Sequence, residues 1–266
     1  MENRHLFVAT FGAYFDESED NYCISFSGYV AGYKTWIDFD WKWREVLKKW
    51  DIKYFKSSEC ETLVGEFLKY RSDPNHPRAP MTPKDKETAR RARTDFTDVI
   101  CQLQDSLCGI GAVVVKRDFE RIISENSRAL FLFGSEPYFL ALQMCLTRMV
   151  TKLAQDNGPF AGKHYIKPIF DSHEEFSGTA KRLYDKFKSK NPNVAAVLLP
   201  LNYEDDIDTA ALQASDFLTY EVRKYLVGLD VEKRSERISL QRISPTVYAI
   251  DRVDYPALVD ILGRQH

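Results

Sequence analysis

Residues 6–31 have the sequence LFVATFGAYFDESEDNYCISFSGYVA, in which a short acidic segment joins two apolar runs. The first run predicts a strand from Leu6 to Asp16, and the second predicts a returning strand from Tyr22 to Ala31. The polar residues Glu17 to Asn21 predict the turn between these strands. We therefore expect an antiparallel hairpin at this point, with Asp16 and Glu17 at its turn.

Helical and strand patterns alternate after the hairpin. Large apolar residues at helical spacing predict an amphipathic helix with an aromatic face, which either packs in the core or forms a base-stacking surface: Trp36, Phe39, Trp43, Leu47 and Trp50. Further helices are expected at 83–107, 118–125, 137–155, 174–190, 207–226 and after 254, and strands at 53–56, 111–116, 165–171, 194–199 and 246–250. This order predicts an α/β fold with a mixed sheet flanked by helices.

The expected domain organisation is simple. Residues 1–226 are predicted to form one α/β domain with a helical insertion at about 60–110, and 227–266 a C-terminal extension packed on it. Pro168 lies inside one predicted strand, which favours an edge or terminal strand position. Four prolines between Arg71 and Pro83 predict a mobile loop before a helix that opens at Thr82-Pro83.

Composition limits the classes of function. The chain has 266 residues, 44% of them hydrophobic, and a formal net charge of −2. A sizeable core is therefore expected, whereas a strongly basic nucleic-acid wrapper is excluded, and any nucleic-acid contact must be local. Five cysteines without a CxxC pair favour buried free thiols. The absence of a long apolar run predicts a cytoplasmic protein without a membrane partner.

Two acidic residues end apolar strands. Asp16 closes the first strand, and Asp171 closes the run Ile166-Lys167-Pro168-Ile169-Phe170. If these strands are parallel neighbours, the two carboxylates lie side by side and repel each other unless a cation lies between them. The alternatives are that Asp16 only opens a turn and that Asp171 only caps a helix.

Two further segments carry candidate residues. Lys56-Ser57-Ser58-Glu59 follows a short aromatic run, and Glu59 either serves a site or only favours a helix N-terminus. Asp216 lies within Leu212-Gln213-Ala214-Ser215-Asp216, in a predicted helix rich in small apolar residues. Asp is a poor helix-interior residue, so we expect Asp216 to be partly buried and to need a cation or another partner. The alternative is a solvated polar stripe.

Together these acids predict divalent-metal chemistry. Carboxylate oxygens are the ligands that Mg²⁺ and Mn²⁺ prefer, and two such ions about 4 Å apart can clamp the oxygens of a phosphodiester. The chain has no Gly-rich phosphate loop, no HxxxH or HExxH spacing and no GxSxG motif. A zinc site and a serine hydrolase are therefore not expected.

The order of these motifs is similar to that of the bacterial domain of unknown function 3800 family. The resemblance spans about residues 10–225 and rests on Tyr14-Phe15-Asp16-Glu17-Ser18, Gly28-Tyr29-Val30-Ala31 with Trp36, Lys56 with Glu59, Phe170-Asp171, and Leu212-Gln213-Ala214-Ser215-Asp216. This chain departs from the family at Glu19, where Gly is frequent, and at Ser215, where Ala is usual.

The resemblance implies a ribonuclease-H-like fold and a nuclease-type site. The acids carried over are Asp16, Glu59, Asp171 and Asp216, as metal ligands and catalytic residues, with Lys56 neutralising charge on the phosphate. The prediction is thus a Mg²⁺- or Mn²⁺-dependent phosphodiesterase acting on DNA or RNA. A non-catalytic nucleic-acid- or protein-binding module and a small-nucleotide phosphohydrolase remain alternatives. The basic run from Lys84 to Arg93 either follows a nucleic-acid backbone or is a solvated helix face.

Overall fold

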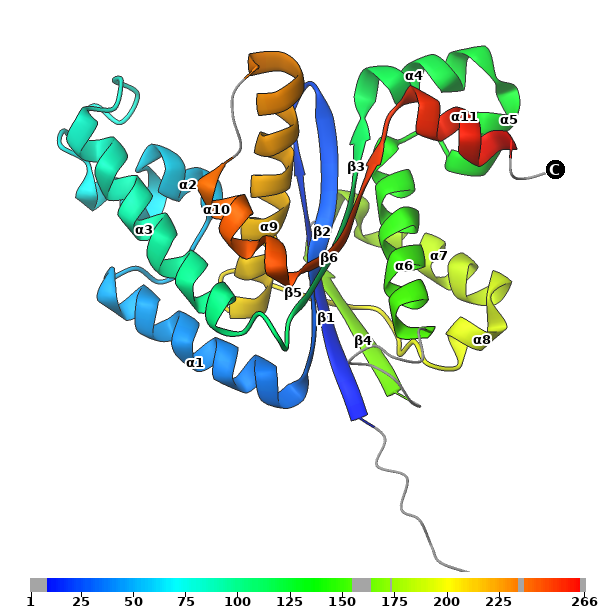
Figure 1. Cartoon of the computed structure of the whole chain (residues 1–266), viewed down its shortest axis with the longest axis horizontal. Coiled ribbons are helices and arrows are strands. Elements are labelled where there is room, and N and C mark those ends of the chain that lie inside the picture. Colours follow the sequence, from blue (N-terminus) through cyan, green and yellow to red (C-terminus); the bar gives the residue numbers. More distant parts are fainter. Residues whose placement is uncertain (1–8, 155–163, 173, 234–236, 264–266) are drawn as a thin grey trace, which may run out of the picture.

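The computed structural model describes residues 9–154, 164–172, 174–233 and 237–263, which form a mixed α/β fold. A six-stranded mixed sheet stands between two layers of helices (Figure 1). This confirms the predicted fold class at the level of a mixed sheet flanked by helices.

The sheet has the strand order β5-β4-β1-β2-β3-β6. Its strands are β1 (Ala9–Glu19), β2 (Cys23–Gly32), β3 (Cys108–Val115), β4 (His164–Asp171), β5 (Asn202–Glu204) and β6 (Val247–Val253). Strands β1, β2 and β3 pair antiparallel, whereas β4 runs parallel to β1, β5 to β4 and β6 to β3. The predicted hairpin is therefore present, and β1 lies at the centre of the sheet. The predicted turn at 17–21 is wrong, because Asp16 to Glu19 still pair with β2 and the chain turns only between Glu19 and Cys23. The first predicted strand residues, 6–8, lie outside the described residues.

Helices cover both faces of this sheet. One layer contains α1 (Tyr33–Lys49), α2 (Ser57–Thr62), α3 (Pro83–Gln102), α9 (Ala210–Val227) and α10 (Ile238–Ile243). The other contains α4 (Lys116–Glu125), α5 (Ser127–Phe133), α6 (Pro137–Ala154), α7 (Glu174–Lys190), α8 (Pro192–Ala195) and α11 (Tyr255–Gly263). Each layer closes a separate hydrophobic core over the sheet, because side chains of a strand alternate between its two faces.

The aromatic pattern of α1 serves the core. Trp36, Phe39, Trp43 and Leu47 are buried, and Phe39 and Trp43 stack with ring centroids 5.1 Å apart. Helix α3 begins where the sequence predicts, with Pro83 in the first turn and a capping box between Thr82 and Asp85. No regular helix or strand occupies the described loop from Arg71 to Thr82. Its mobility remains a prediction.

Two predicted strands are wrong. The described residues Lys53–Lys56 form no strand, and the Phe55 N–H donates instead to the Gln213 side chain, 3.0 Å away. In the predicted strand at 194–199, helix α8 occupies the first residues, and only Leu198 pairs with Ile166 of β4. A short aromatic or β-branched run forms a strand only where a neighbouring strand has free backbone hydrogen-bonding groups. Residues 53–56 have no such neighbour, and 194–199 have one only at Leu198.

Pro168 does not mark an edge strand, because β4 lies between β1 and β5. The backbone of Ile166 bonds toward the β5 side, to Val197 and Leu199. Alternate residues of a strand direct their polar groups to the same neighbour, so the missing N–H of Pro168 faces that side too. The ladder is interrupted there between Leu198 and Asn202, so Pro168 removes no hydrogen bond.

The C-terminal residues complete the sheet. Strand β6 forms its edge beside β3, and Val253 and Leu258 are buried in the core. Part of the expected extension at 227–266 is thus an edge strand of the domain itself. Among the described helices, none alone has both the length and the apolar composition to cross a membrane, although α5 and the Pro137–Thr151 part of α6, bent by 58°, meet that test as a pair.

Candidate carboxylate site

Asp16 and Asp171 lie on neighbouring parallel strands, on one face of the sheet. Asp171 ends β4, whereas Asp16 lies three residues before the end of β1. Phe15 pairs with Phe170 in the register of β1 and β4, so the next residues of the two strands also lie side by side. The rings of Phe15 and Phe170 meet at 5.8 Å in the core on the opposite face. Alternation then directs both carboxylates to the face that carries α9. The predicted adjacency of Asp16 and Asp171 is confirmed.

Helix α9 brings the third acid to the same place. Asp216 is buried, with 7% of its surface exposed, as predicted from its small apolar neighbours. The Ser215 hydroxyl donates to the Tyr14 carbonyl oxygen at 2.8 Å, and Thr219 donates to the Asp16 carbonyl oxygen at 3.2 Å. These bonds fix α9 across β1 and place Asp216 beside Asp16.

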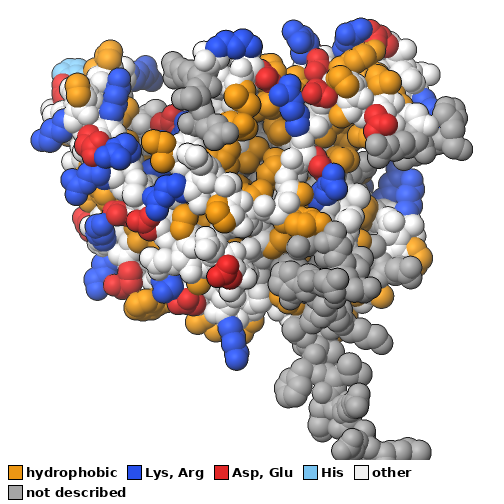
Figure 2. Space-filling view, in the orientation of Figure 1, with side chains coloured by type: hydrophobic (Ala, Val, Ile, Leu, Met, Phe, Trp, Pro, Cys, Tyr) orange, Lys and Arg blue, Asp and Glu red, His pale blue; other side chains and the backbone are white. Residues whose placement is uncertain are grey.

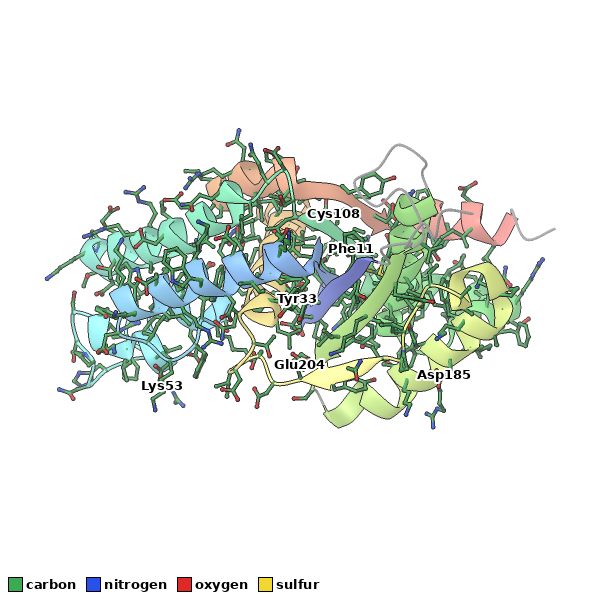
Figure 3. All side chains as sticks on the ribbon, turned by 90° about the horizontal axis from the view of Figure 1, so that it is seen from below. Phe11, Tyr33, Lys53, Cys108, Asp185 and Glu204 are labelled. Carbon is green, nitrogen blue, oxygen red and sulfur yellow. The ribbon has the colours of Figure 1, made fainter. Side chains whose placement is uncertain are left out.

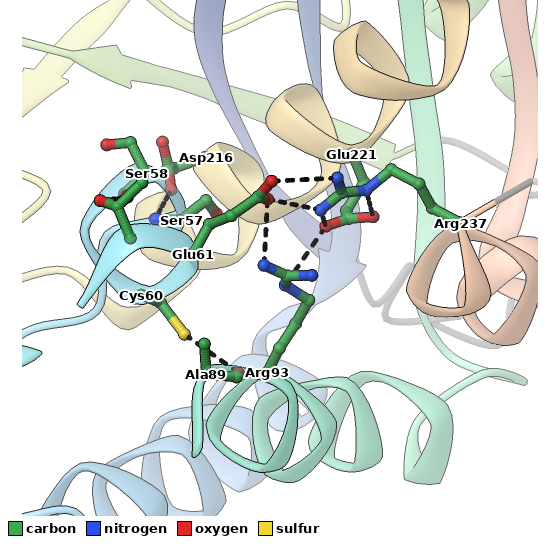
Figure 4. Close-up of polar contacts among 10 residues, drawn as sticks. Ser57, Ser58, Cys60, Glu61, Ala89, Arg93, Asp216, Glu221 and Arg237 are labelled. Carbon is green, nitrogen blue, oxygen red and sulfur yellow. Dashed lines mark hydrogen bonds and ion pairs between the residues drawn. The ribbon is translucent and has the colours of Figure 1, made fainter. Parts of the chain in front are cut away.

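The sequence does not reveal the nearest partner of Asp216. Its carboxylate accepts the backbone N–H of Ser57 at 2.7 Å, in the first turn of α2 (Figure 4). A helix N-terminus favours a negative charge, because its first N–H groups have no acceptor within the helix. Asp216 is therefore stabilised in part by backbone from a segment 159 residues away.

A fourth acid, Asp206, was missed by the sequence interpretation. It lies in the loop before α9, is 8% exposed and accepts the Lys56 amino group at 3.2 Å. Its backbone N–H also donates to the Asp171 carboxylate. The signal in the sequence was the acidic run Glu204-Asp205-Asp206 directly before the helix that carries Asp216.

A cavity of about 350 Å³ opens between these residues. Asp16, Asp171, Asp216 and Lys56 line it, so the structure brings together four of the five predicted site residues. Arg223 of α9 closes one side and is held by Ser18 at 2.9 Å and Asp20 at 2.6 Å. The cavity thus combines several carboxylates with two cationic side chains.

The carboxylates oppose one another's ionisation. Burial raises the pKa of Asp16 well above its usual range, and Asp216, Glu17 and Asp171 raise it further, against a lowering by the Glu17 N–H. Burial also raises the pKa of Asp216, although the Ser57 N–H and Lys56 act in the opposite direction. The pKa of Asp171 is raised by burial and by Asp206. The cluster therefore has too little positive charge for all its acids.

Lys56 supplies the positive charge inside the cluster. Burial lowers the pKa of Lys56, but the carboxylates of Asp206, Asp216 and Asp16 outweigh burial and hold it above its usual range. The amine is therefore protonated at neutral pH, and 43% of its side chain remains exposed. It can act as a point charge toward a bound anion.

Glu59 is the predicted site residue that, in the described structure, does not line the cavity. Its carboxylate accepts the Glu66 N–H at 3.0 Å and the Tyr54 hydroxyl at 3.2 Å. A Cβ atom on Gly65, which has a φ of +52°, would collide with this carboxylate. Glu59 therefore closes the turn after α2 instead of joining Asp16.

Gln213 has a structural role. Its oxygen accepts from Trp43 at 2.8 Å and from the Phe55 N–H at 3.0 Å, and its nitrogen donates to the carbonyl oxygens of Asp206 and Ile207. These four bonds use its amide fully. Gln213 thus holds the loop that carries Asp206 and the segment before α2 in place.

The basic run on α3 is largely a solvated helix face. Lys84, Lys86, Arg90 and Arg91 are exposed, and Arg90 pairs with Glu87 at 2.7 Å. Figure 2 shows acidic side chains interspersed with these basic ones over the part where Figure 1 places α2 and α3. This mixed surface does not favour the backbone-binding alternative for the run.

Arg93 turns inward to a buried ion-pair network (Figure 4). It contacts Glu61 at 3.0 Å and Glu221 at 3.7 Å, and Arg237 contacts each of the same two acids at 2.7 Å. The four residues come from α2, α3, α9 and the segment before α10. The network therefore fixes α2, and with it Ser57, against the helix that carries Asp216.

The donor set of the cavity fits a hard divalent cation in chemistry. Asp16, Asp171 and Asp216 offer buried or half-buried carboxylate oxygens, and their raised pKa values indicate unmet demand for positive charge. In this structure, however, no three or more His, Cys, Asp or Glu side chains among the described residues are arranged to hold a metal ion. A metal at this cavity is therefore a proposal about the bound state.

Comparison of the chain with known protein families, with curated proteins and with solved structures finds no match.

Proposed function

We propose that the protein is a divalent-metal-dependent phosphodiesterase that cleaves nucleic acid at the cavity formed by Asp16, Asp171, Asp216 and Lys56. One observation carries the proposal. Three carboxylates from β1, β4 and α9 share a cavity in which their ionisation is opposed by burial and by one another. Buried carboxylates that repel one another destabilise the folded protein, and a bound cation of charge +2 would offset this repulsion.

Each residue has a role in this proposal. Asp16, Asp171 and Asp216 would hold Mg²⁺ or Mn²⁺, which supplies Lewis-acid stabilisation of a phosphodiester. Lys56 neutralises charge on a phosphate oxygen, since its amine is protonated and half exposed. Asp206 keeps this amine in the cavity through their 3.2 Å contact. The Ser57 N–H holds the Asp216 carboxylate in one orientation.

We also propose that the fold is ribonuclease-H-like and that the chain is related to the domain of unknown function 3800 family. A hairpin followed by a parallel strand beside β1, with acids on the first strand, a later strand and a late helix, supports a ribonuclease-H-like fold. It also supports the resemblance to the domain of unknown function 3800 family. Glu59 of α2 does not line the cavity as that resemblance implies, and Asp206 is a further acid that contacts the cavity residue Lys56. None of the five cysteines, all of which lie in the described residues, forms a disulfide, which supports a cytoplasmic location.

The test is cleavage of single- and double-stranded DNA and RNA with Mg²⁺, with Mn²⁺ and with EDTA. Wild type should cleave at least one polymer only with metal, and Asp16→Asn and Asp216→Asn should lose cleavage by at least about 100-fold. Asp105→Asn, an exposed acid outside the cavity, is the matched control and should retain activity.

The same assays, extended to mononucleotides and to binding, also test the two alternative functions. Hydrolysis of nucleotides but not of polymers would replace the proposal with a small-nucleotide phosphohydrolase. Binding without metal-dependent cleavage of any substrate would replace it with a non-catalytic module. Equal loss of activity in Asp16→Asn and Asp105→Asn would show that the cavity is not the site.

A further inference from the structure

A second hollow, of about 730 Å³, lies on the same face of the sheet as the carboxylate cavity. Gly12 and Tyr14 of β1 and Lys167 and Ile169 of β4 form its floor, and the first half of α1 forms its wall. In the register of the strands, Gly12 pairs with Lys167 and Tyr14 with Ile169. The next residues on this face of both strands are Asp16 and Asp171. The two hollows therefore follow one another along β1 and β4.

This face is open over β4. The described helices α9 and α1 lie over β1 and β2, whereas Lys167 keeps 43% of its side chain exposed and Tyr165 is 42% exposed. Glu204 of β5, the strand beside β4, contacts Lys167 at 3.8 Å. Tyr33 and Glu204, both labelled in Figure 3, mark the α1 and β5 sides.

The first half of α1, which forms the wall of the hollow, exposes large side chains to solvent. Tyr33 is 73% exposed and Ile37 is 53% exposed, although both are large and apolar. The edge of the Trp36 ring lies against Tyr14, with centroids 4.9 Å apart, and Trp36 donates to the Gly12 carbonyl oxygen at 3.0 Å. Trp36 is thereby fixed, whereas Tyr33 has a free ring face at the entrance.

The polar groups of the hollow do not suit a phosphate backbone. Asp40 lines it and is paired with Arg44 at 2.7 Å, Lys167 is paired with Glu204, and the net charge of the chain is −2. Lys167, the cation that lines the hollow, therefore already has an acidic partner, whereas carboxylates can accept hydrogen bonds from the N–H groups of bases. Exposed aromatic rings stack on bases of any sequence, and this stacking is the usual device of single-strand binding.

We propose that this hollow, which we name the β4 groove, binds the bases of single-stranded nucleic acid whose scissile phosphate lies at the carboxylate cavity. The proposal rests on the proposed phosphodiesterase function and names its substrate class. From Thr10 to Asp16 the strand spans roughly 20 Å. This is the length of about six stacked nucleotides.

The test measures binding separately from cleavage. Fluorescence anisotropy of labelled 12-mers of dT and of U, and of a duplex, is recorded in EDTA, where metal-dependent hydrolysis does not occur. Single strands should bind at least about 10-fold more tightly than the duplex. Tyr33→Ala should weaken single-strand binding about 10-fold, and Tyr33→Phe, which retains the ring, should restore it. Phe131→Ala, which removes an 83% exposed ring from α5, is the control and should leave binding unchanged.

The outcomes separate the two proposals. Equal binding of single strand and duplex, or equal effects of Tyr33→Ala and Phe131→Ala, would overturn the β4 groove, even if Mg²⁺-dependent cleavage persisted. Single-strand binding that depends on Tyr33, in a protein that cleaves nothing with Mg²⁺ or Mn²⁺, would support the groove and defeat the phosphodiesterase.

Discussion

At the scale of single residues, the carboxylate cavity depends on acids that the fold holds together against their repulsion. Asp16 is 6% exposed and Asp216 is 7% exposed, and each raises the energy of the other's charged form. The available compensation comes from the N–H groups of Glu17 and Ser57 and from Lys56. The metal-free protein is therefore less stable at neutral pH than its packing alone would allow.

Asp16→Asn should stabilise the metal-free protein in a pH-dependent way. The folded-state pKa of Asp16 is raised, so between the ordinary Asp pKa and the raised value the folded state binds more protons than the unfolded state. Wild-type stability therefore falls as the pH rises through this window. Asn cannot ionise and keeps an oxygen that accepts the Glu17 N–H. The free energy of unfolding of the metal-free variant should therefore exceed that of wild type by on the order of 1 kcal/mol at neutral pH and by little at pH 3.5.

Urea unfolding in EDTA from pH 3.5 to pH 8 measures the difference in the free energy of unfolding between the variant and wild type. The same experiment with Mg²⁺ measures how much the metal stabilises each protein. Mg²⁺ should stabilise wild type but not the variant. A variant that is less stable than wild type at every pH would contradict the proposed repulsion at Asp16.

Glu221→Gln should destabilise the protein by about 3 kcal/mol, because it leaves Arg93 and Arg237 buried with less compensating charge. The Glu221 side chain is 1% exposed. Glu87→Gln is the matched control, since its partner Arg90 is on the surface, and it should change the free energy of unfolding by less than about 1 kcal/mol. Chemical denaturation of both variants gives the comparison, and equal effects would show that the network contributes no more than a surface pair.

At the scale of elements, the hairpin of β1 and β2 fixes the position of Asp16. A Cβ atom on Gly28 of β2 would lie 1.8 Å from the Tyr14 carbonyl oxygen and 2.8 Å from the Phe15 Cα atom. Both neighbours are in the backbone and cannot rotate away. Gly28 therefore permits the close approach of β2 to the strand that carries Asp16.

Gly28→Ala should lower stability by about 3 kcal/mol, because the two strands must separate or bend to accept a methyl group. It should also reduce metal-dependent cleavage, because Asp16 moves with β1. Gly178→Ala on α7 is the control, since a Cβ atom there meets nothing within 4 Å. That variant should gain about 0.5–1 kcal/mol from helix propensity. Thermal unfolding gives the Tm of both variants relative to wild type. An unchanged Tm for Gly28→Ala would show that the two strands accommodate the methyl group without loss of stability.

At the scale of the whole molecule, the two layers of helices depend on a sheet that is completed late in the chain. Strand β3 is buried along all eight of its residues, and β6 forms the edge that covers it. Leu258 of α11 is also fully buried, in the core that contains β3 residues. The sheet therefore includes residues far beyond 226, where the sequence placed the end of the main domain.

A chain ending at residue 226 should aggregate or lose cooperative unfolding, because it exposes the β3 edge and the apolar face under α11. A chain ending at Gly263 is the control and should behave as the full chain does. Size-exclusion chromatography and thermal melts compare the two. Cooperative, monomeric folding of the shorter chain would show that residues 227–266 are an independent extension.

Local sequence patterns were enough to predict several helices and strands and part of the carboxylate cavity. Apolar spacing predicted α1, which buries one face, and apolar content predicted β2 and α9, which are buried on nearly all sides. The adjacency of Asp16 and Asp171 could be predicted because each follows an apolar run and the two strands are parallel neighbours, although Asp16 lies inside β1 and not at its end. Tertiary contacts, in contrast, bring Asp206 to Lys56, keep Glu59 out of the cavity and place the Ser57 N–H against Asp216. These contacts join residues up to 159 positions apart or depend on a turn such as that at Gly65, so no local pattern encodes them. Pairing also decided which short apolar runs became strands, because a strand needs a neighbour with free backbone hydrogen-bonding groups and only the completed sheet provides one.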